Sequence, residues 1–239
     1  MLAASGPVIP TFPHASKCVQ DNRWLCVDWV RKNWHGLLAP RLAQHIELSL
    51  IAVGIGFVLA FALALLAFRL RVVARPIGAF SDFLYTIPSL ALFQLLVPIT
   101  GIGWTTTEIA LVSYTLLILF RNTLVGLRDV PDDVREAAAG MGFGRWRTLT
   151  RVELPLALPA IVAGLRIAVV STISIATVAG FLFDQGLGQP IADAVRADPV
   201  FRTEIVVVGG LTVALALVAD FVVVLAGRMA TPWLRRRTA

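Results

Sequence analysis

The chain has 239 residues and a formal net charge of +6; 57% of its residues are hydrophobic and only 15% are charged. A soluble domain averages roughly 45–50% apolar and about 25% charged residues, because it needs a polar coat. Intrinsic disorder is also excluded, since a disordered chain lacks apolar residues to bury. The composition therefore predicts an integral membrane protein. Its basic balance indicates cationic loops that orient the chain in a bilayer and not nucleic-acid binding.

The first 45 residues form a tail ahead of the first long apolar run. Residues 1–16 contain three prolines and no lysine or arginine, so they do not resemble a signal peptide. Residues 23–38 place tryptophans and aliphatic residues among charges. This stripe is typical of an amphipathic helix lying at the outer membrane interface, or of a lead-in that packs on its own first span. Cys18 and Cys26 either pair with each other, if the tail is extracytoplasmic, or are free thiols.

Five apolar runs are long enough to cross a bilayer, which needs about 20 helical residues. They cover residues 46–68, 77–98, 106–127, 156–183 and 203–226. Pro88 predicts a kink or break in the second run, because proline removes a backbone donor. Among the charges in these runs, we expect Arg121 to snorkel toward the interface, and Asp82 and Asp220 to meet the interface near the ends of their spans.

The cations outside the spans predict the orientation. Segments 69–76 and 128–155 hold three and five arginines, and the basic tail 228–239 holds four. Segment 99–105 has none, and segment 184–202 has two against three aspartates. By the positive-inside rule the first group is cytoplasmic, which puts the C-terminus inside and the N-terminus outside. The five cations of residues 1–45 are not explained by this arrangement.

The connection 128–155 is the exception among short loops, and long loops in compact proteins usually carry function. Pro131 fits the first turn of a helix, with two acidic residues after it at the positive helix end. Three glycines within 140–144 end that helix, and 145–152 form a second short helix that Pro155 stops. Such a unit either docks into a groove on a partner or is a surface helix that docks nothing.

The same loop carries a spaced pattern of residue identities, EAA-x3-G-x9-I-x-L-P, with valine in place of isoleucine. The residues are Glu136, Ala137, Ala138, Gly142, Val152, Leu154 and Pro155. The pattern resembles the signature loop of binding-protein-dependent ABC transporter permeases of the type I importer kind. In that family the loop is the coupling helix, which inserts into a cleft on the cytoplasmic ATPase. The resemblance implies this coupling role for the seven residues.

Other segments are similar to the glycine betaine, choline and proline osmoprotectant branch of that family. They are TIPSLALFQLLVPITGIG (86–103), LFRNT (119–123), LPLALPAIVAGLR (154–166) and GLG (186–188). The resemblance implies an all-α, multi-pass inner-membrane permease domain over 46–227. It also implies a second permease subunit, identical or homologous, an ATPase dimer that holds ATP and Mg, and an extracytoplasmic binding protein. Ergothioneine, methionine and other amino acids remain alternative substrates.

The sequence offers little chemistry of its own. No lysine follows a glycine, so a phosphate-binding loop is absent and the energy source must be another subunit. His14, His35 and His45 are isolated and their spacing defines no metal site. We therefore expect a permease subunit that binds no cofactor and is not an enzyme. An ATPase-independent channel or secondary transporter is the rival interpretation.

Polar and aromatic residues in or beside the spans are candidates for the solute pathway. They are Tyr85, Pro88, Ser89, Phe93, Tyr114 and Arg166. Aromatic faces attract quaternary ammonium groups through cation–π interactions. The break at Pro88 and Ser89 is expected to line the passage. Arg166 either joins helices through carbonyls or an acid, or faces the pathway, and the sequence does not identify the acid.

Overall fold

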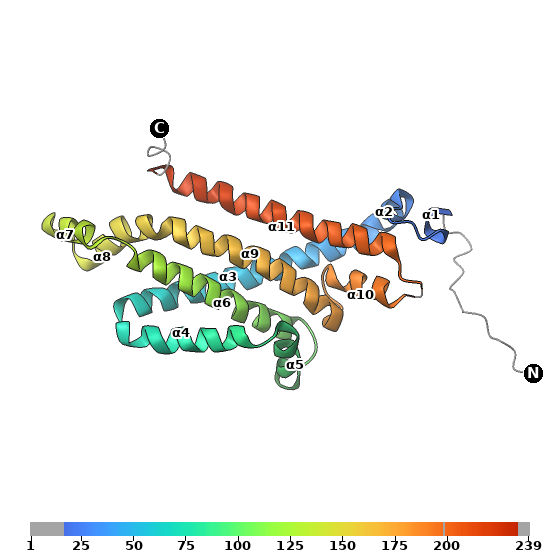
Figure 1. Cartoon of the computed structure of the whole chain (residues 1–239), viewed down its shortest axis with the longest axis horizontal. Coiled ribbons are helices and arrows are strands. Elements are labelled where there is room, and N and C mark those ends of the chain that lie inside the picture. Colours follow the sequence, from blue (N-terminus) through green and yellow to red (C-terminus); the bar gives the residue numbers. More distant parts are fainter. Residues whose placement is uncertain (1–16, 198, 234–239) are drawn as a thin grey trace, which may run out of the picture.

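A computed structural model of the chain describes residues 17–197 and 199–233, in which every regular element is a helix (Figure 1). The predictions that fall on residues 1–16 and 234–239, including His14 and most of the basic tail, lie outside the described residues. The first half contains α1 (Lys17–Gln20), α2 (Val27–Asn33), η1 (Trp34–Leu38), α3 (Ala39–Arg69), α4 (Arg71–Thr86), α5 (Ser89–Thr100) and α6 (Trp104–Arg128). The second half contains α7 (Asp132–Gly140), α8 (Arg145–Thr148), η2 (Leu149–Glu153), α9 (Leu154–Phe183), α10 (Gly188–Arg196) and α11 (Arg202–Ala230).

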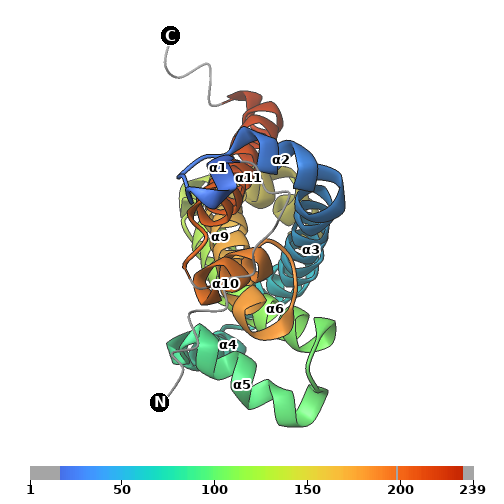
Figure 2. The ribbon, with the colours of Figure 1, turned by 90° about the vertical axis from the view of Figure 1, so that its right-hand side faces the viewer.

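The long helices lie side by side in a bundle with two distinct ends. Helices α7 and α8 lie at one end, called the α7 end below, and α1, α2, α5 and α10 lie at the other, called the α10 end (Figure 1). Helix α6 packs against α3, α4, α5 and α9, and α11 runs along α9. Seen from the α10 end, α4 and α11 lie on opposite sides of the bundle (Figure 2).

Four continuous helical segments are long and apolar enough to cross a membrane, and a bent pair supplies a fifth. The continuous segments are Val27–Arg69, Trp104–Arg128, Arg145–Phe183 and Arg202–Ala230. The predicted break at Pro88 is confirmed: α4 and α5 meet there at 100°. The second predicted run, 77–98, is therefore divided between the two helices of this bent pair.

Small residues allow the central helices to approach closely. Ala52, Ala60, Ala64 and Ala67 of α3 are fully buried. A Cβ added to Gly126 of α6 would lie 2.8 Å from the Cβ of Ala160 in α9. Close backbone approach through alanine and glycine is the usual device for packing helices in lipid, where no hydrophobic effect drives them together.

Helices α2 and η1 lie before α3 and extend the first long helix toward the N-terminus. They pack against the bundle at the α10 end. Trp29 and Val30 pack against a buried cluster of Leu38, Leu187 and Val208, which joins α2 and η1 to α10 and α11. Cys18 and Cys26 form a disulfide with their Cα atoms 5.7 Å apart. Of the two thiol states that the sequence left open, the structure has the paired one. The interfacial placement of this segment stays a prediction.

Candidate functional site

Helix α7 begins one residue after Pro131, which occupies the N-cap and not the first turn as expected. Two acidic residues follow in the first turn, where the helix dipole favours negative charge. The helix ends in a Schellman motif: the amide of Phe143 donates to the Ala138 carbonyl at 3.0 Å, and that of Gly142 donates to the Ala139 carbonyl at 2.9 Å. Gly142 has φ +77°, a left-handed conformation that favours glycine.

Some residues of the signature pattern are exposed on and just after α7, and three others are half-buried where η2 meets α9. Glu136, Ala137 and Gly142 are exposed, and Ala138 is buried. Their neighbours Met141 and Trp146 are 68% and 70% exposed, so apolar side chains stand beside the acidic one. An exposed helix end with large apolar side chains is a surface suited to a partner protein.

The remaining pattern residues, Val152, Leu154 and Pro155, are half-buried where η2 runs into α9. Pro155 does not stop the second short helix, as the sequence suggested. It lies at the second residue of α9, directly after the π-helical turn η2, and the helix continues through it from Arg145 to Phe183. The loop is therefore joined without interruption to a long membrane helix.

Arg135 holds this unit to the bundle, and sequence reasoning missed it. Its Nε donates to Oε1 of the buried Glu153 at 3.0 Å, and its Nη1 donates to Asp132 at 2.6 Å. Its Nη2 donates to the Leu127 carbonyl at 2.8 Å, and the guanidinium lies 5.8 Å from the ring centre of Phe68. One side chain thus joins α7 to η2, α6 and α3. The only sequence signal was a cation directly before the pattern, Arg135, and an acid within it, Glu153.

Four of the predicted pathway residues, Tyr85, Pro88, Ser89 and Tyr114, meet at the break between α4 and α5. The rings of Tyr85 and Tyr114 lie 6.0 Å apart in an edge-to-face arrangement. The Tyr114 hydroxyl donates a hydrogen bond to the carbonyl of Ile87, just before Pro88. Ser89 is the first residue of α5. This bond satisfies a carbonyl that the break removes from the helical ladder, as irregular backbone at membrane depth requires.

The other two predicted pathway residues lie elsewhere. Phe93 is fully buried and packs edge-to-face on Phe183, with ring centres 5.7 Å apart. Arg166 of α9 forms a two-point ion pair with Asp220 of α11, at 2.7 and 2.9 Å. The structure thus names the acid that the sequence left open. Asp220 thus takes part in a helix–helix contact, and its placement at the membrane interface stays a prediction.

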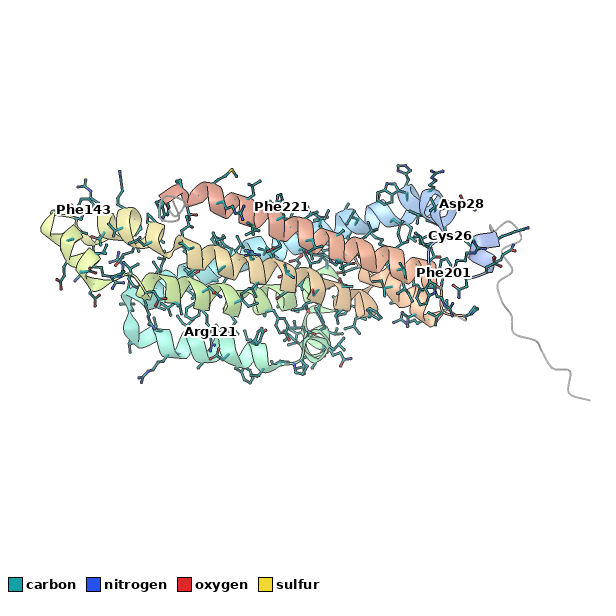
Figure 3. All side chains as sticks on the ribbon, turned by 45° about the horizontal axis from the view of Figure 1, so that its top comes forward. Cys26, Asp28, Arg121, Phe143, Phe201 and Phe221 are labelled. Atoms are coloured by element: carbon teal, nitrogen blue, oxygen red, sulfur yellow. A yellow bond between two sulfur atoms is a disulfide. The ribbon has the colours of Figure 1, made fainter. Side chains whose placement is uncertain are left out.

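A second ion pair joins Arg121 to Asp82, two charges that the sequence did not connect. The Nη2 of Arg121, the α6 residue labelled in Figure 3, lies 2.5 Å from Oδ1 of Asp82 in α4, so the two helices are joined by charge. The helices pack so that these side chains face each other, and pairing costs less than separate exposure to hydrocarbon. The placement of both residues at the membrane interface stays a prediction.

The GLG segment belongs to a tight contact at the α10 end. The buried His45 accepts a hydrogen bond at Nδ1 from the Leu187 amide at 3.2 Å and pairs through Nε2 with the Ile173 carbonyl at 3.1 Å. Gly186 and Gly188 let the chain pass against His45 and against Gly180, where side chains would overlap. Within the described part of the chain no three metal-ligating side chains gather.

The family described as binding-protein-dependent transport system inner membrane component matches residues 52–236. The chain belongs to this family. It is 32% identical over 198 residues to the glycine betaine/carnitine/choline transport system permease protein OpuCB of Bacillus subtilis, covering 82% of this chain and 90% of the relative. It is 34% identical to the choline transport system permease protein OpuBB of the same organism, with the same coverage.

Solved structures give the same fold. The inward-facing MetNI methionine ABC transporter contains a chain that matches with a TM-score of 0.74 at 22% identity, over 82% of this chain and 96% of that one. The chain is therefore a multi-pass inner-membrane permease with the type I ABC importer fold, as its signature loop indicated. The family match begins at residue 52, so the segment that carries the disulfide lies before it.

Proposed function

We propose that this permease is the transmembrane subunit of an ATP-driven importer of quaternary-amine osmoprotectants such as glycine betaine, choline and proline betaine. The observation that carries the proposal is the α7 unit, an exposed helix held by Arg135 to three other elements. A force on its exposed face reaches the membrane helices directly, because few flexible residues lie between them.

The partners follow from this assignment. Two permease subunits, identical or homologous, enclose the pathway, and an ATPase dimer docks on the exposed face of Glu136, Ala137 and Gly142. ATP and Mg²⁺ belong to that ATPase. When it closes, it moves α7 and η2, and α9 transmits the motion. An extracytoplasmic binding protein delivers the solute at the α10 end.

Two observations support the orientation in which the α7 end is cytoplasmic. The arginine-rich segments 69–76 and 128–155 lie at that end, in agreement with the positive-inside rule. The disulfide of Cys18 and Cys26 lies at the α10 end, and disulfides persist in oxidising compartments outside the cytosol.

The named substrates of the relatives support the quaternary-amine assignment, and methionine, ergothioneine and other amino acids are the alternatives. The test is uptake into proteoliposomes that contain the permease, its ATPase and its binding protein. We expect ATP-dependent glycine betaine and choline uptake that excess methionine or ergothioneine does not compete. Competition by either one, or uptake by the permease alone, would contradict the assignment.

The coupling role has its own test in the same vesicles. Glu136→Lys reverses the charge of the exposed docking face, so we expect uptake to be abolished while the subunit still inserts. Asp28→Lys reverses an exposed charge on α2 at the other end and serves as the matched control. Normal uptake by Glu136→Lys rules out coupling through this face.

A further inference from the structure

The Asp82–Arg121 ion pair stands on an open face of the bundle, at membrane depth. Its arginine and aspartate side chains are 58% and 42% exposed. Asp82 lies about three helical turns, or about 16 Å, beyond the start of α4, and Arg121 lies about 10 Å before the end of α6. A hydrocarbon layer about 30 Å thick that begins at these helix ends includes both positions. Exposed charges at that depth require water or another protein surface in front of them, because lipid does not solvate them.

An aromatic ring completes this face. Tyr85 follows Asp82 by three residues on α4, so the two side chains share one helix face. The Tyr85 side chain is itself 52% exposed, and its ring lies 6.0 Å from that of Tyr114. The open face of α4 and α6 therefore presents a carboxylate, a guanidinium and an aromatic ring within one helical turn.

The opposite side of the bundle is chemically different. The exposed residues in the middle of α11 are apolar: Val213, Leu217, Val218, Phe221 and Val222 are 56–66% exposed, and its exposed arginines, Arg202 and Arg228, lie near its two ends. Such a side suits lipid or an apolar neighbour (Figure 3). The polar side is the one that a solute in water can use.

We propose that Asp82, Arg121 and Tyr85 form a subsite in the pathway for zwitterionic trimethylammonium compounds. This inference rests on the proposed function and deepens it. The trimethylammonium group sits against the Tyr85 ring and the Asp82 carboxylate, and the substrate's carboxylate takes the Arg121 guanidinium in a two-point hydrogen bond. The substrate's ammonium group thus takes the place of Arg121 beside Asp82, and its carboxylate takes the place of Asp82 beside Arg121.

The pairing has a consequence for selectivity. In the empty site the two charges neutralise each other, so a simple cation gains little there. Glycine betaine engages both groups, whereas choline has no carboxylate and leaves Arg121 without its partner. Choline therefore weakens the ion pair without giving Arg121 a new partner at membrane depth, so the subsite favours betaines over choline.

The test is the ratio of glycine betaine to choline uptake in vesicles containing the full importer. Arg121→Gln keeps hydrogen-bonding ability but removes the charge. We expect it to lower glycine betaine uptake about tenfold, the value of one charge-assisted hydrogen bond, and to change choline uptake far less. Tyr85→Leu removes the ring that both ammonium groups use, so we expect it to lower the uptake of both.

Two further variants keep the test decisive. Arg166→Gln breaks the other intramembrane pair, and we expect it to lower both uptakes equally. The exchange variant Asp82→Arg/Arg121→Asp preserves the ion pair, and we expect it to retain binding-protein-stimulated ATP hydrolysis but lose the betaine preference. An unchanged ratio in Arg121→Gln overturns the subsite and leaves the importer assignment standing. No uptake of either compound by the unaltered importer overturns both.

Discussion

Arg166 of α9 forms a two-point ion pair with Asp220 of α11, with its Nε 2.7 Å and its Nη2 2.9 Å from the carboxylate oxygens of Asp220. This ion pair is important for the position of α11, because only 6% of the most apolar 18-residue stretch of that helix is buried in the bundle. The partner of a removed charge is left alone within the membrane span, where solvation is poor.

We therefore expect Asp220→Asn and Arg166→Gln each to lower the melting temperature of the purified permease. The exchange variant Arg166→Asp/Asp220→Arg should regain most of the loss, since the pair is restored in reverse. Thermal unfolding in detergent measures both, with the exposed Arg31→Gln of α2 as control. Equal losses in the single and exchange variants would show that shape, and not charge, holds α11.

Gly142 is expected to be irreplaceable for conformational reasons. A Cβ at this position meets open space, but the φ of +77° costs any L-residue about 1–2 kcal/mol. Gly142→Ala should reduce uptake and ATPase stimulation together, and Gly142→Asp should abolish uptake, with membrane levels unchanged. Gly140→Ala is the matched control, because Gly140 is helical and equally open. Loss of function in both alanine variants would indicate that small size, and not backbone geometry, is required.

Removal of Arg135 should uncouple the loop from the bundle. Arg135→Ala leaves the carboxylate of Glu153 buried without its cation, and we expect a cost of about 2 kcal/mol. This value is below that of a fully buried pair, because the Arg135 side chain is 25% exposed. The expected phenotype is ATP hydrolysis without uptake, measured in the same vesicles. Arg151→Gln, which changes an exposed arginine of η2, should keep the two activities linked.

Gly188 tolerates no side chain. An added Cβ would lie 1.9 Å from the Thr177 carbonyl oxygen and 2.8 Å from the Cα of Gly180, and both are backbone atoms that cannot yield. Gly188→Ala should lower stability by at least about 1–3 kcal/mol and reduce the amount of permease in the membrane. Gly210→Ala, at an open helical site, should be neutral or slightly stabilising. Equal membrane levels for both variants would refute the contact.

Asn22 joins the disulfide-closed loop to the start of α11. Its Nδ2 donates to the Val200 carbonyl at 2.8 Å, and its Oδ1 accepts from the Arg202 amide at 3.0 Å. Asn22→Ala removes both bonds and strains a residue with φ +47°. We expect hydrogen exchange at the Arg202 amide to quicken about tenfold. Asn33→Ala loses only a local bond to Trp29 and should leave that amide unchanged.

Much of the fold could be predicted because its signals are local. Apolar runs mark membrane helices, Pro88 marks the break, and the glycines after α7 mark its end. The signature loop was recognisable because spacing and identity are both written in the chain. These features depend on neighbours within a few residues.

The ion pairs could not be predicted, because they depend on how helices rotate about their axes. Arg166 and Asp220 lie 54 residues apart, and nothing between them indicates that they face each other. Arg121 and Asp82 were read as separate interface residues for the same reason. Glu153 occupies a position that the signature pattern leaves unspecified, between Val152 and Leu154, so the pattern gave it no role.

The first long helix, from Val27 to Arg69, has 43 residues, which makes it about 65 Å long and twice the thickness of a hydrocarbon core. A helix of this length that crosses the membrane extends beyond the hydrocarbon core at one end or both, and we propose that it acts as a lever. A tilt of about 5° displaces its tip by about 6 Å. Because Asn22 ties the tip to the beginning of α11, the lever cannot swing alone. In the proposed importer, we expect a small movement at the α7 end to be delivered as a larger, coordinated displacement at the α10 end.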